Sequence, residues 1–552
     1  MKKKFFVISG FVLVAVISFG FVELDQSFFK INQNIDIFGR VYKEIVANYV
    51  DEVDPEKFMR AGIDGMLNTL DPYTVYMVDK EGEEIDLITH GEYGGVGVSI
   101  GLRDGQVTVI SPMEGYSAFK QGMKAGDIIT EVDGIRVSGM KIDSVRMLVR
   151  GEPGSVVKMK VQREGEKNPL EFSLVREQIQ IQNVSFADYV SPGIGYINVE
   201  RFSRRAGEEV RMAIKELKAK GALNGIILDL RNNPGGLLEA AVDIVSKFAP
   251  SGSTVVTTRG RRTDEERTYT VNESPVAKDI PLVVLVNNGS ASASEIVAGA
   301  MQDLDRGVIL GTRSFGKGLV QTVVPLSSNA SIKITTARYY TPSGRCIQEI
   351  DYLHKNKDGV FLTTPDSLRK DFSTKNGRLV KDQGGIMPDS VVEQNTQSEY
   401  FAELMRKAMF FKFATTYVSQ HQTADSQFTA TDGVLKEFEK YLSTQKFQYT
   451  DAVEKRVNEI HDEMKKGNYS SEAAAELTKF SNLITKEKSN ALARHKDEVR
   501  AALEEEINGR YFGEKGRTRT ELSYDKQVNT AVALLNNTKA YEQLLRLPLA
   551  KR

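Results

Sequence analysis

A serine and a lysine have the setting that nucleophilic chemistry needs. Ser292 follows residues 282–286, an apolar run with the length and branched side chains of a buried strand, and precedes residues whose apolar spacing predicts a helix. Lys317 lies between two glycines, shortly after a second apolar run at residues 308–310. A right-handed crossover makes such strands parallel neighbours, and their loops then leave the same edge of the sheet. We therefore expect Ser292 and Lys317 to meet in space, although they are 25 residues apart in the chain.

A serine hydroxyl is a poor nucleophile until a base takes its proton. A lysine can be that base when burial lowers its pKa from about 10.4 toward neutrality, because desolvation disfavours the ammonium form. Free N–H groups at the helix start, beginning with Ala293, could stabilise an oxyanion, and the tight turn at residues 232–236 could supply a second donor. Histidine, the usual base, is absent near the serine turn; the five histidines are His90, His354, His421, His461 and His495.

Both residues also have a purely structural interpretation. The string from Ser292 to Glu295 fits a capping box, in which the serine caps the helix and the glutamate reaches back to it. Lys317 on its own fits a solvated loop charge. The residues alone leave these alternatives open.

Five stretches of the chain together resemble the C-terminal processing peptidases, the tail-specific serine/lysine proteases. Within roughly residues 35–392 they read LDLRNNPGGLL, GSASASEIVAGAMQD, GTRSFGKGLVQ, YYTPSGRCIQ and GGIMPD. The resemblance implies that Ser292 is the nucleophile, that Lys317 is the base, and that Gln321 orients the lysine. It also implies oxyanion donors at the backbone of Ala293 and Gly235.

Residues 86–180 are rich in glycine and contain short β-like runs. The glycine loop at residues 94–98, followed by GMKAGDIITEVDGIRV, resembles a PDZ domain. Consecutive backbone N–H groups in such a loop can hold a peptide's terminal carboxylate while the peptide adds to the sheet edge as a strand. Arg150, at the end of a predicted helix, either senses the bound peptide or is a cation that the helix dipole favours. The residues expected to bind the peptide are Gly95, Val96, Gly97, Val98 and Arg150.

The first residues predict export. Three lysines precede residues 5–22, an apolar run that is near the length needed to span a bilayer and that no clean cleavage site follows. We expect a periplasmic protein that residues 5–22 anchor to the bacterial inner membrane. Cys346 is the only cysteine, which excludes a disulfide framework and a cysteine-rich metal site, and we expect no metal or cofactor. The net charge of −1 gives no field that would attract nucleic acid.

The expected fold is a multidomain α+β protein. The resemblance implies a crotonase/ClpP-like α/β protease core with an inserted PDZ domain, a β-sandwich or barrel. The N-terminal helices form either a collar on the core or an oligomerisation arm. The charged helical extension could be a shell, a dimer arm or an adaptor site, and no function can be inferred for residues 351–381. The expected segments are 1–24 (signal peptide or anchor), 25–85 (helical), 86–180 (PDZ), 181–392 (protease core) and 393–552 (helical extension).

The sequence therefore predicts an exported serine endopeptidase that binds protein substrates by their C-terminal tails. A homo-oligomer or an adaptor partner through the helical regions stays possible. One alternative is an envelope scaffold with a PDZ domain and an inactive protease core. Another uses Ser314 and Lys317 as an S-x-x-K pair, which needs both residues at a helix start, and glycines beside the lysine disfavour that helix. An acyl-CoA enzyme of the crotonase type is disfavoured by the export signal and the PDZ resemblance.

Overall fold

The computed structural model describes residues 29–78, 91–262, 266–327, 329–357, 359–421, 426–467 and 469–546. The predicted export segment at residues 5–22 lies outside these ranges. No helix within them is long and apolar enough to cross a bilayer. The chain divides into two compact units, of which the first takes the described residues up to 78 together with residues 321–335 and 352–360.

The described residues of the first unit include two helices and an antiparallel pair of strands, among other strands. A helix covers residues 29–48, and α2 (Pro55–Leu67) follows it. Asp54 caps α2 by accepting hydrogen bonds from the next N–H groups, and Pro55 stands at the first helical position, where its missing N–H costs nothing. β1 (Val75–Val78) then pairs with the first residues of β18 (Ala330–Tyr340).

The core of the second unit is a six-stranded sheet in the order β10-β11-β12-β15-β16-β23. All neighbours are parallel except β10 and β11, so the predicted parallel arrangement of the two strands around Ser292 is confirmed. The sequence did not predict the edge strand β10. The strands are β10 (Val184–Ser191), β11 (Ile194–Val199), β12 (Gly225–Asp229), β15 (Leu282–Val286), β16 (Val308–Gly311) and β23 (Ser390–Val391).

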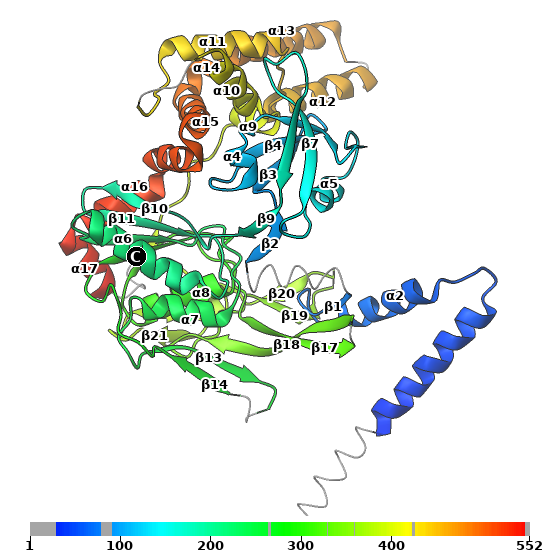
Figure 1. Ribbon diagram of the computed structural model, residues 1–552, viewed down its shortest axis with the longest axis vertical. Helices are drawn as coiled ribbons and strands as arrows, with labels where there is room; N and C mark the ends of the chain where they lie inside the picture. Colours follow the sequence, from blue (N-terminus) through cyan, green and yellow to red (C-terminus); the bar gives the residue numbers. More distant parts are fainter. Residues whose placement is uncertain are drawn as a thin grey trace, which may run out of the picture. The chain divides into compact units, whose positions relative to one another are not determined.

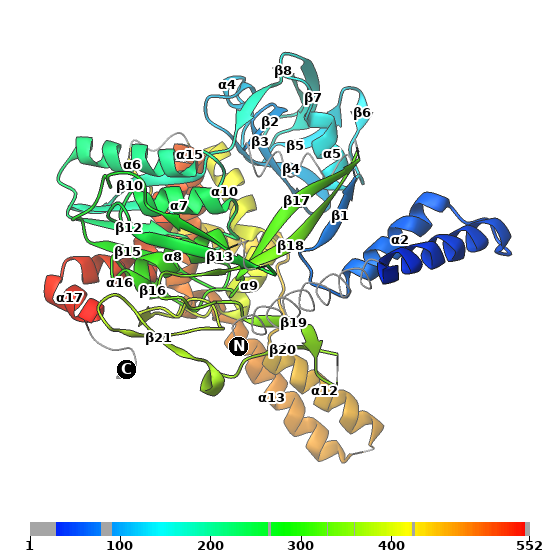
Figure 2. The same ribbon diagram turned by 90° about the horizontal axis from the view of Figure 1, so that it is seen from below.

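Helices cover both faces of this sheet (Figures 1 and 2). Every residue of β12 and β15 is buried, and successive side chains point to opposite faces. One face packs on α6 (Ala206–Lys220), α7 (Leu238–Ser246) and α8 (Ala293–Asp303). The other packs on α16 (Lys526–Leu535) and α17 (Thr538–Arg546), although more than a hundred residues separate these helices from the last strand.

A second sheet reaches the site through β18. Its final residues pair with β13 (Thr254–Gly260), which in turn pairs with β14 (Arg267–Thr270). Tyr339 lies on this part of β18 and is buried.

The glycine-rich segment forms its own β-domain around a separate hydrophobic core. The main sheet has the order β3-β4-β5-β7-β8, so β3 is an edge strand. Strand β2 (Glu92–Gly95) pairs with β9 (Glu177–Gln180) where the segment joins the core. The other elements are β3 (Val98–Arg103), β4 (Gln106–Pro112), α4 (Ser117–Lys120), β5 (Ile128–Val132), β6 (Ile135–Arg136), α5 (Ile142–Val149), β7 (Val156–Gln162) and β8 (Leu170–Val175).

The helical extension has a core rich in aromatic side chains. One long helix was predicted over residues 399–418, but the structure has two, because Ala408 adopts the left-handed conformation with φ 52°. The helix α15 (Lys496–Tyr524) turns sharply at Gly513, where φ is 67°. The remaining helices are α9 (Glu399–Arg406), α10 (Met409–Gln420), α11 (Asp432–Thr444), α12 (Ala452–Lys466), α13 (Ser471–Ser489) and α14 (Ala491–Arg494).

Candidate active site

Two tight turns meet at the carboxyl edge of the parallel sheet. One follows β12 and the other follows β15. Asn232 and Asn287 exchange hydrogen bonds of 2.9 Å between these turns. The N–H of Ala291 donates to the carbonyl of Asn233 at 3.0 Å. Asn233 is fully buried, and its side chain donates to the carbonyl of Val199 on a third strand. The turns are therefore held against each other before any substrate is present.

Ser292 lies between β15 and α8 in a strained backbone conformation. Its φ and ψ angles are 55° and −114°, a region that residues with a Cβ seldom occupy. A serine at a sharp strand-to-helix turn presents its hydroxyl outward beside the free N–H groups of the helix start. This placement is the one that the sequence predicted for a nucleophile.

The predicted oxyanion donors lie next to Ser292. A methyl group added to Gly235 would stand 2.8 Å from the nitrogen of Ala293 and 2.9 Å from Cβ of Ser292. The N–H of Ala293 opens α8, so no carbonyl of that helix can accept it. The N–H of Gly235 instead donates to the side-chain oxygen of Asn233 at 2.9 Å. Ala293 is thus the more available donor of the two.

A buried tyrosine joins the serine turn to the lysine loop. The hydroxyl of Tyr339 contacts the carbonyl oxygens of both Ser292, at 3.1 Å, and Lys317. The backbone N–H of Tyr339 donates to the carbonyl of Gly318, and the N–H of Gly318 donates to the side chain of Gln348. Ser292 and Lys317 are both half-buried. The structure therefore brings together the two residues that the sequence singled out.

A fully buried carboxylate completes the frame. One oxygen of Glu295 accepts from the N–H groups of Ser292 and Lys317, and the other accepts from Gly316 N–H and the Ser314 hydroxyl. Burial raises the pKa of Glu295 to about 7, although these hydrogen bonds oppose the shift. The capping box that the sequence predicted is present at the start of α8, and the bond to Ser292 N–H is one half of it.

The alternative that pairs Ser314 with Lys317 lacks its structural requirement. Residues 313–318 do not form a helix. Ser314 is buried, its hydroxyl donates to Glu295 at 2.6 Å, and it accepts from the N–H of Ile386 at 2.6 Å. The hydroxyl is thus engaged in holding the loop.

Gln321 lies on β17 (Leu319–Ser327) and belongs to the first unit, whereas Ser292 and Lys317 belong to the second. Its side-chain amide donates to the hydroxyl of Thr335 at 3.2 Å. Its role in orienting Lys317 stays a prediction.

The predicted carboxylate loop leads into the edge strand of the β-domain. Gly95 ends β2, and Val98 begins β3. The carbonyls of Val96 and Gly97 accept from N–H groups of the same domain, Ala118 and Met113. This geometry fits a peptide added beside β3, and the role of the loop stays a prediction.

Arg150 is exposed at the C-cap of α5, as expected. Its guanidinium lies over the ring of Tyr93 on β2, 4.6 Å from the centroid. The stacking links the end of α5 to the strand that joins the domain to the core. Arg150 therefore makes a cation–π contact. This contact does not decide between a role in sensing the peptide and a role as a cation at the helix end.

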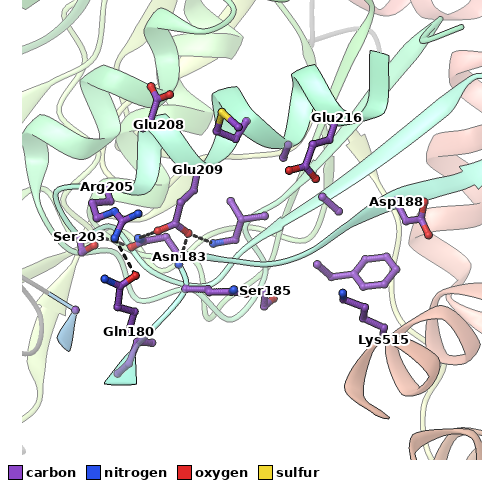
Figure 3. A pocket seen from close by; sticks show the side chains of 18 of the residues that line it. Gln180, Asn183, Ser185, Asp188, Ser203, Arg205, Glu208, Glu209, Glu216 and Lys515 are labelled. Carbon is purple, nitrogen blue, oxygen red and sulfur yellow. Dashed lines mark hydrogen bonds between the residues drawn. The ribbon is translucent and has the colours of Figure 1, made fainter. Parts of the chain in front are cut away.

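A cavity of about 550 Å³ lies elsewhere, beside α6 and β10 (Figure 3). Neither Ser292 nor Lys317 lines it. Glu209 points toward Asn183 there and accepts from its side chain and backbone. Because these polar groups satisfy one another, we assign the cavity no function.

Sequence reasoning missed Tyr339 and Gln348 as residues of the site. Both lie within the stretch YYTPSGRCIQ, whose likeness to a protease family marked the region without giving the two side chains a role. Glu295 was considered only as a helix cap. Its second set of contacts, to the lysine loop, comes from residues more than 15 positions away, which no local pattern reveals.

The chain matches four described families. They are "Peptidase family S41" over residues 193–353, "PDZ domain" over 108–163, "Probable PDZ-protease, C-terminal helical domain" over 400–535 and "Activating protease CtpB N-terminal domain" over 22–82.

Two curated relatives give the extent of the similarity. The chain is 38% identical over 316 residues to the carboxy-terminal-processing protease of Bartonella bacilliformis. The aligned region covers 57% of this chain and 72% of that protein. It is 32% identical over 383 residues to the carboxy-terminal processing protease CtpB of Bacillus subtilis. This aligned region covers 68% of this chain and 79% of that protein.

Solved structures are similar as well. The photosystem II D1 C-terminal processing protease is 31% identical, with 60% of this chain and 91% of that chain covered and a TM-score of 0.33. A PDZ domain of a carboxy-terminal protease from Vibrio cholerae, solved in complex with peptide, is 28% identical and covers 16% of this chain and 99% of its own, with a TM-score of 0.16.

Proposed function

The chain belongs to the carboxy-terminal processing proteases, serine peptidases of family S41, and we propose that Ser292 and Lys317 are its catalytic dyad. The observation that carries this proposal is the Tyr339 hydroxyl, which contacts the backbone of both residues. The strained turn at Ser292 and the close approach of Gly235 support it.

The reaction follows from these positions. Neutral Lys317 accepts the proton as the hydroxyl of Ser292 attacks the peptide carbonyl. The N–H of Ala293 stabilises the tetrahedral oxyanion, and Gly235 N–H joins it by giving up its bond to Asn233. Lys317 then protonates the leaving amine, and water hydrolyses the acyl-enzyme. Gln321 orients the lysine. This chemistry uses no metal or cofactor.

The substrate class follows from the PDZ domain. We propose that it captures the free C-terminus of a protein, with the loop from Gly95 to Val98 around the carboxylate and the tail added beside β3. Arg150 couples the occupied groove to Tyr93 and thus to β2. Residues 5–22 export the chain and hold it at the inner membrane, where unfolded envelope proteins are the substrates.

The test is cleavage of an unfolded reporter protein that ends in an apolar tail. We expect Ser292→Ala and Lys317→Ala each to lose at least about 10³-fold in kcat/KM, the scale of removing a nucleophile or its base. Matched controls remove the same groups at exposed positions, Ser251→Ala and Lys278→Ala, and should keep wild-type rates. Full activity in either dyad variant would overturn the dyad. An inert wild-type chain would favour the scaffold alternative.

A further inference from the structure

Glu295 touches both halves of the proposed site through one side chain. Its four donors are the backbone N–H groups of Ser292, Gly316 and Lys317, at 2.8, 2.6 and 2.9 Å, and the hydroxyl of Ser314 at 2.6 Å. The carboxylate is completely buried and belongs to the third residue of α8, in the first turn of that helix. All four acceptor positions of an ionised carboxylate are therefore used.

We propose that ionised Glu295 is a positioning residue that fixes the Ser292 turn and the Lys317 loop in their reactive arrangement. This inference rests on the proposed dyad. The two segments come from different strand ends and are 25 residues apart. Since one rigid group holds the backbone of both, a change at Glu295 displaces the nucleophile relative to its base.

Only the ionised form can make these four contacts. A neutral acid carries a proton on one oxygen, and three of its four partners are N–H groups that cannot accept it. The Ser314 hydroxyl could accept, but it already accepts from Ile386 N–H and would have to redirect its own proton. Protonation of Glu295 therefore breaks at least one of these four bonds or reverses the bond to Ser314.

This requirement makes activity depend on the protonation state of Glu295 as well as on that of Lys317. Burial raises the pKa of Glu295 to about 7, so acidification below that value neutralises the carboxylate. The other titratable groups that face this region are Lys317, Tyr339 and Glu349, and Glu349 pairs with Arg369. Activity should thus fall on acidification for two reasons, since Lys317 gains a proton and Glu295 gains another.

Glu295→Gln tests the role of the ionised carboxylate, because the side chain keeps its size but cannot ionise. Its NH2 group must face N–H donors or the Ser314 hydroxyl, so we expect kcat to fall by about 10- to 100-fold at pH 8, the scale of a small misplacement of reacting groups. The matched control is Glu239→Gln, an exposed glutamate in the first turn of α7, which should behave as wild type.

The decisive measurement is log(kcat/KM) against pH from about 5.5 to 9, with circular dichroism to confirm folding of each variant. Below pH 7 the wild type should approach a slope of two, because two protons must leave, whereas Glu295→Gln should show a slope of one. Ser314→Ala provides a second test. The Ser314 bond lowers the pKa of Glu295, so its loss should move the acidic limb to higher pH.

An unchanged kcat and slope in Glu295→Gln, with an unmoved acidic limb in Ser314→Ala, would overturn the inference and leave the dyad intact. The dyad itself fails only if Ser292→Ala or Lys317→Ala stays active. The two proposals are therefore separated by different variants in one assay.

Discussion

At the scale of single residues, the site depends on backbone positions that few side chains tolerate. Ser292 keeps a φ of 55° because both neighbouring segments are held by buried hydrogen bonds, those of Glu295 and of Asn233. Gly235 has a φ of 97° and packs directly on the Ser292 turn. The strained backbone of Ser292 is thus held in place partly by its close packing against Gly235.

Gly235→Ala should abolish catalysis. The added methyl group would lie 2.7 Å from the carbonyl oxygen of Ala291 and 2.9 Å from Cβ of Ser292, so Ser292 must move. We expect kcat to fall at least about 100-fold, as for a misplaced reacting group. Gly252→Ala separates crowding from backbone strain, because Gly252 has a φ of 84° with nothing within 4 Å. The kcat and thermal midpoint of both variants check this, and equal losses would contradict it.

At the scale of elements, a buried ion network attaches α16 to the end of β12. Arg231 bonds to Asp229 on that strand and to Asp525, the N-cap of α16. Its guanidinium also donates to Gln527, and Tyr196 donates to Asp229 at 2.7 Å. The same strand end that bears the Asn232 turn is therefore fixed to a helix almost three hundred residues away.

Arg231→Ala should destabilise the core by about 3–5 kcal/mol, because it leaves two buried carboxylates without the guanidinium that balances their charge. The side chains of Asp229 and Asp525 are only 4% and 9% exposed. Arg519→Ala is the control, since Arg519 is 56% exposed and its ion pair with Asp188 should contribute about 0–1 kcal/mol. Urea unfolding followed by circular dichroism measures both, and similar losses in the two variants would refute the argument.

At the scale of the whole molecule, the protease core is completed by the distant helices α16 and α17. Val283, Leu285 and Leu310 point away from α8 and are buried against these helices. The hydroxyl of Tyr541 on α17 also bonds to the backbone of Leu282 at the start of β15. The strand that precedes Ser292 is thus packed on both faces.

Two substitutions on α16 test this arrangement with the same chemistry. Ala531 is fully buried against the sheet, whereas Ala533 is exposed. Ala531→Asp would bury a charge without a partner, so we expect loss of several kcal/mol, poor solubility and loss of activity. Ala533→Asp should leave the thermal midpoint and the cleavage rate close to wild type. Normal activity in Ala531→Asp would show that α16 is dispensable.

The helices and strands that depend on local sequence could be predicted, but few of the contacts between distant residues could. The strand and helix around Ser292, the 142–149 helix and the 330–340 strand follow from apolar runs and the spacing of apolar residues, and all four are confirmed. Arg378 was not foreseen. It lies in a polar segment without clear pattern, yet it is fully buried between Asp305 and Asp389. The spacing of apolar residues could not show which surface α16 covers, because an apolar helix face can pack on any apolar surface.

The packing of α16 and α17 on the sheet also sets a time order. A ribosome makes β15, Ser292 and Lys317 long before it reaches residues 526–546. At about 5–20 residues per second, the interval is on the order of ten seconds or more. During that interval the face of the sheet that packs on α16 and α17 is without these helices. We therefore expect the apolar side chains of Val283, Leu285 and Leu310 to lack their final cover until residues 526–546 have been made.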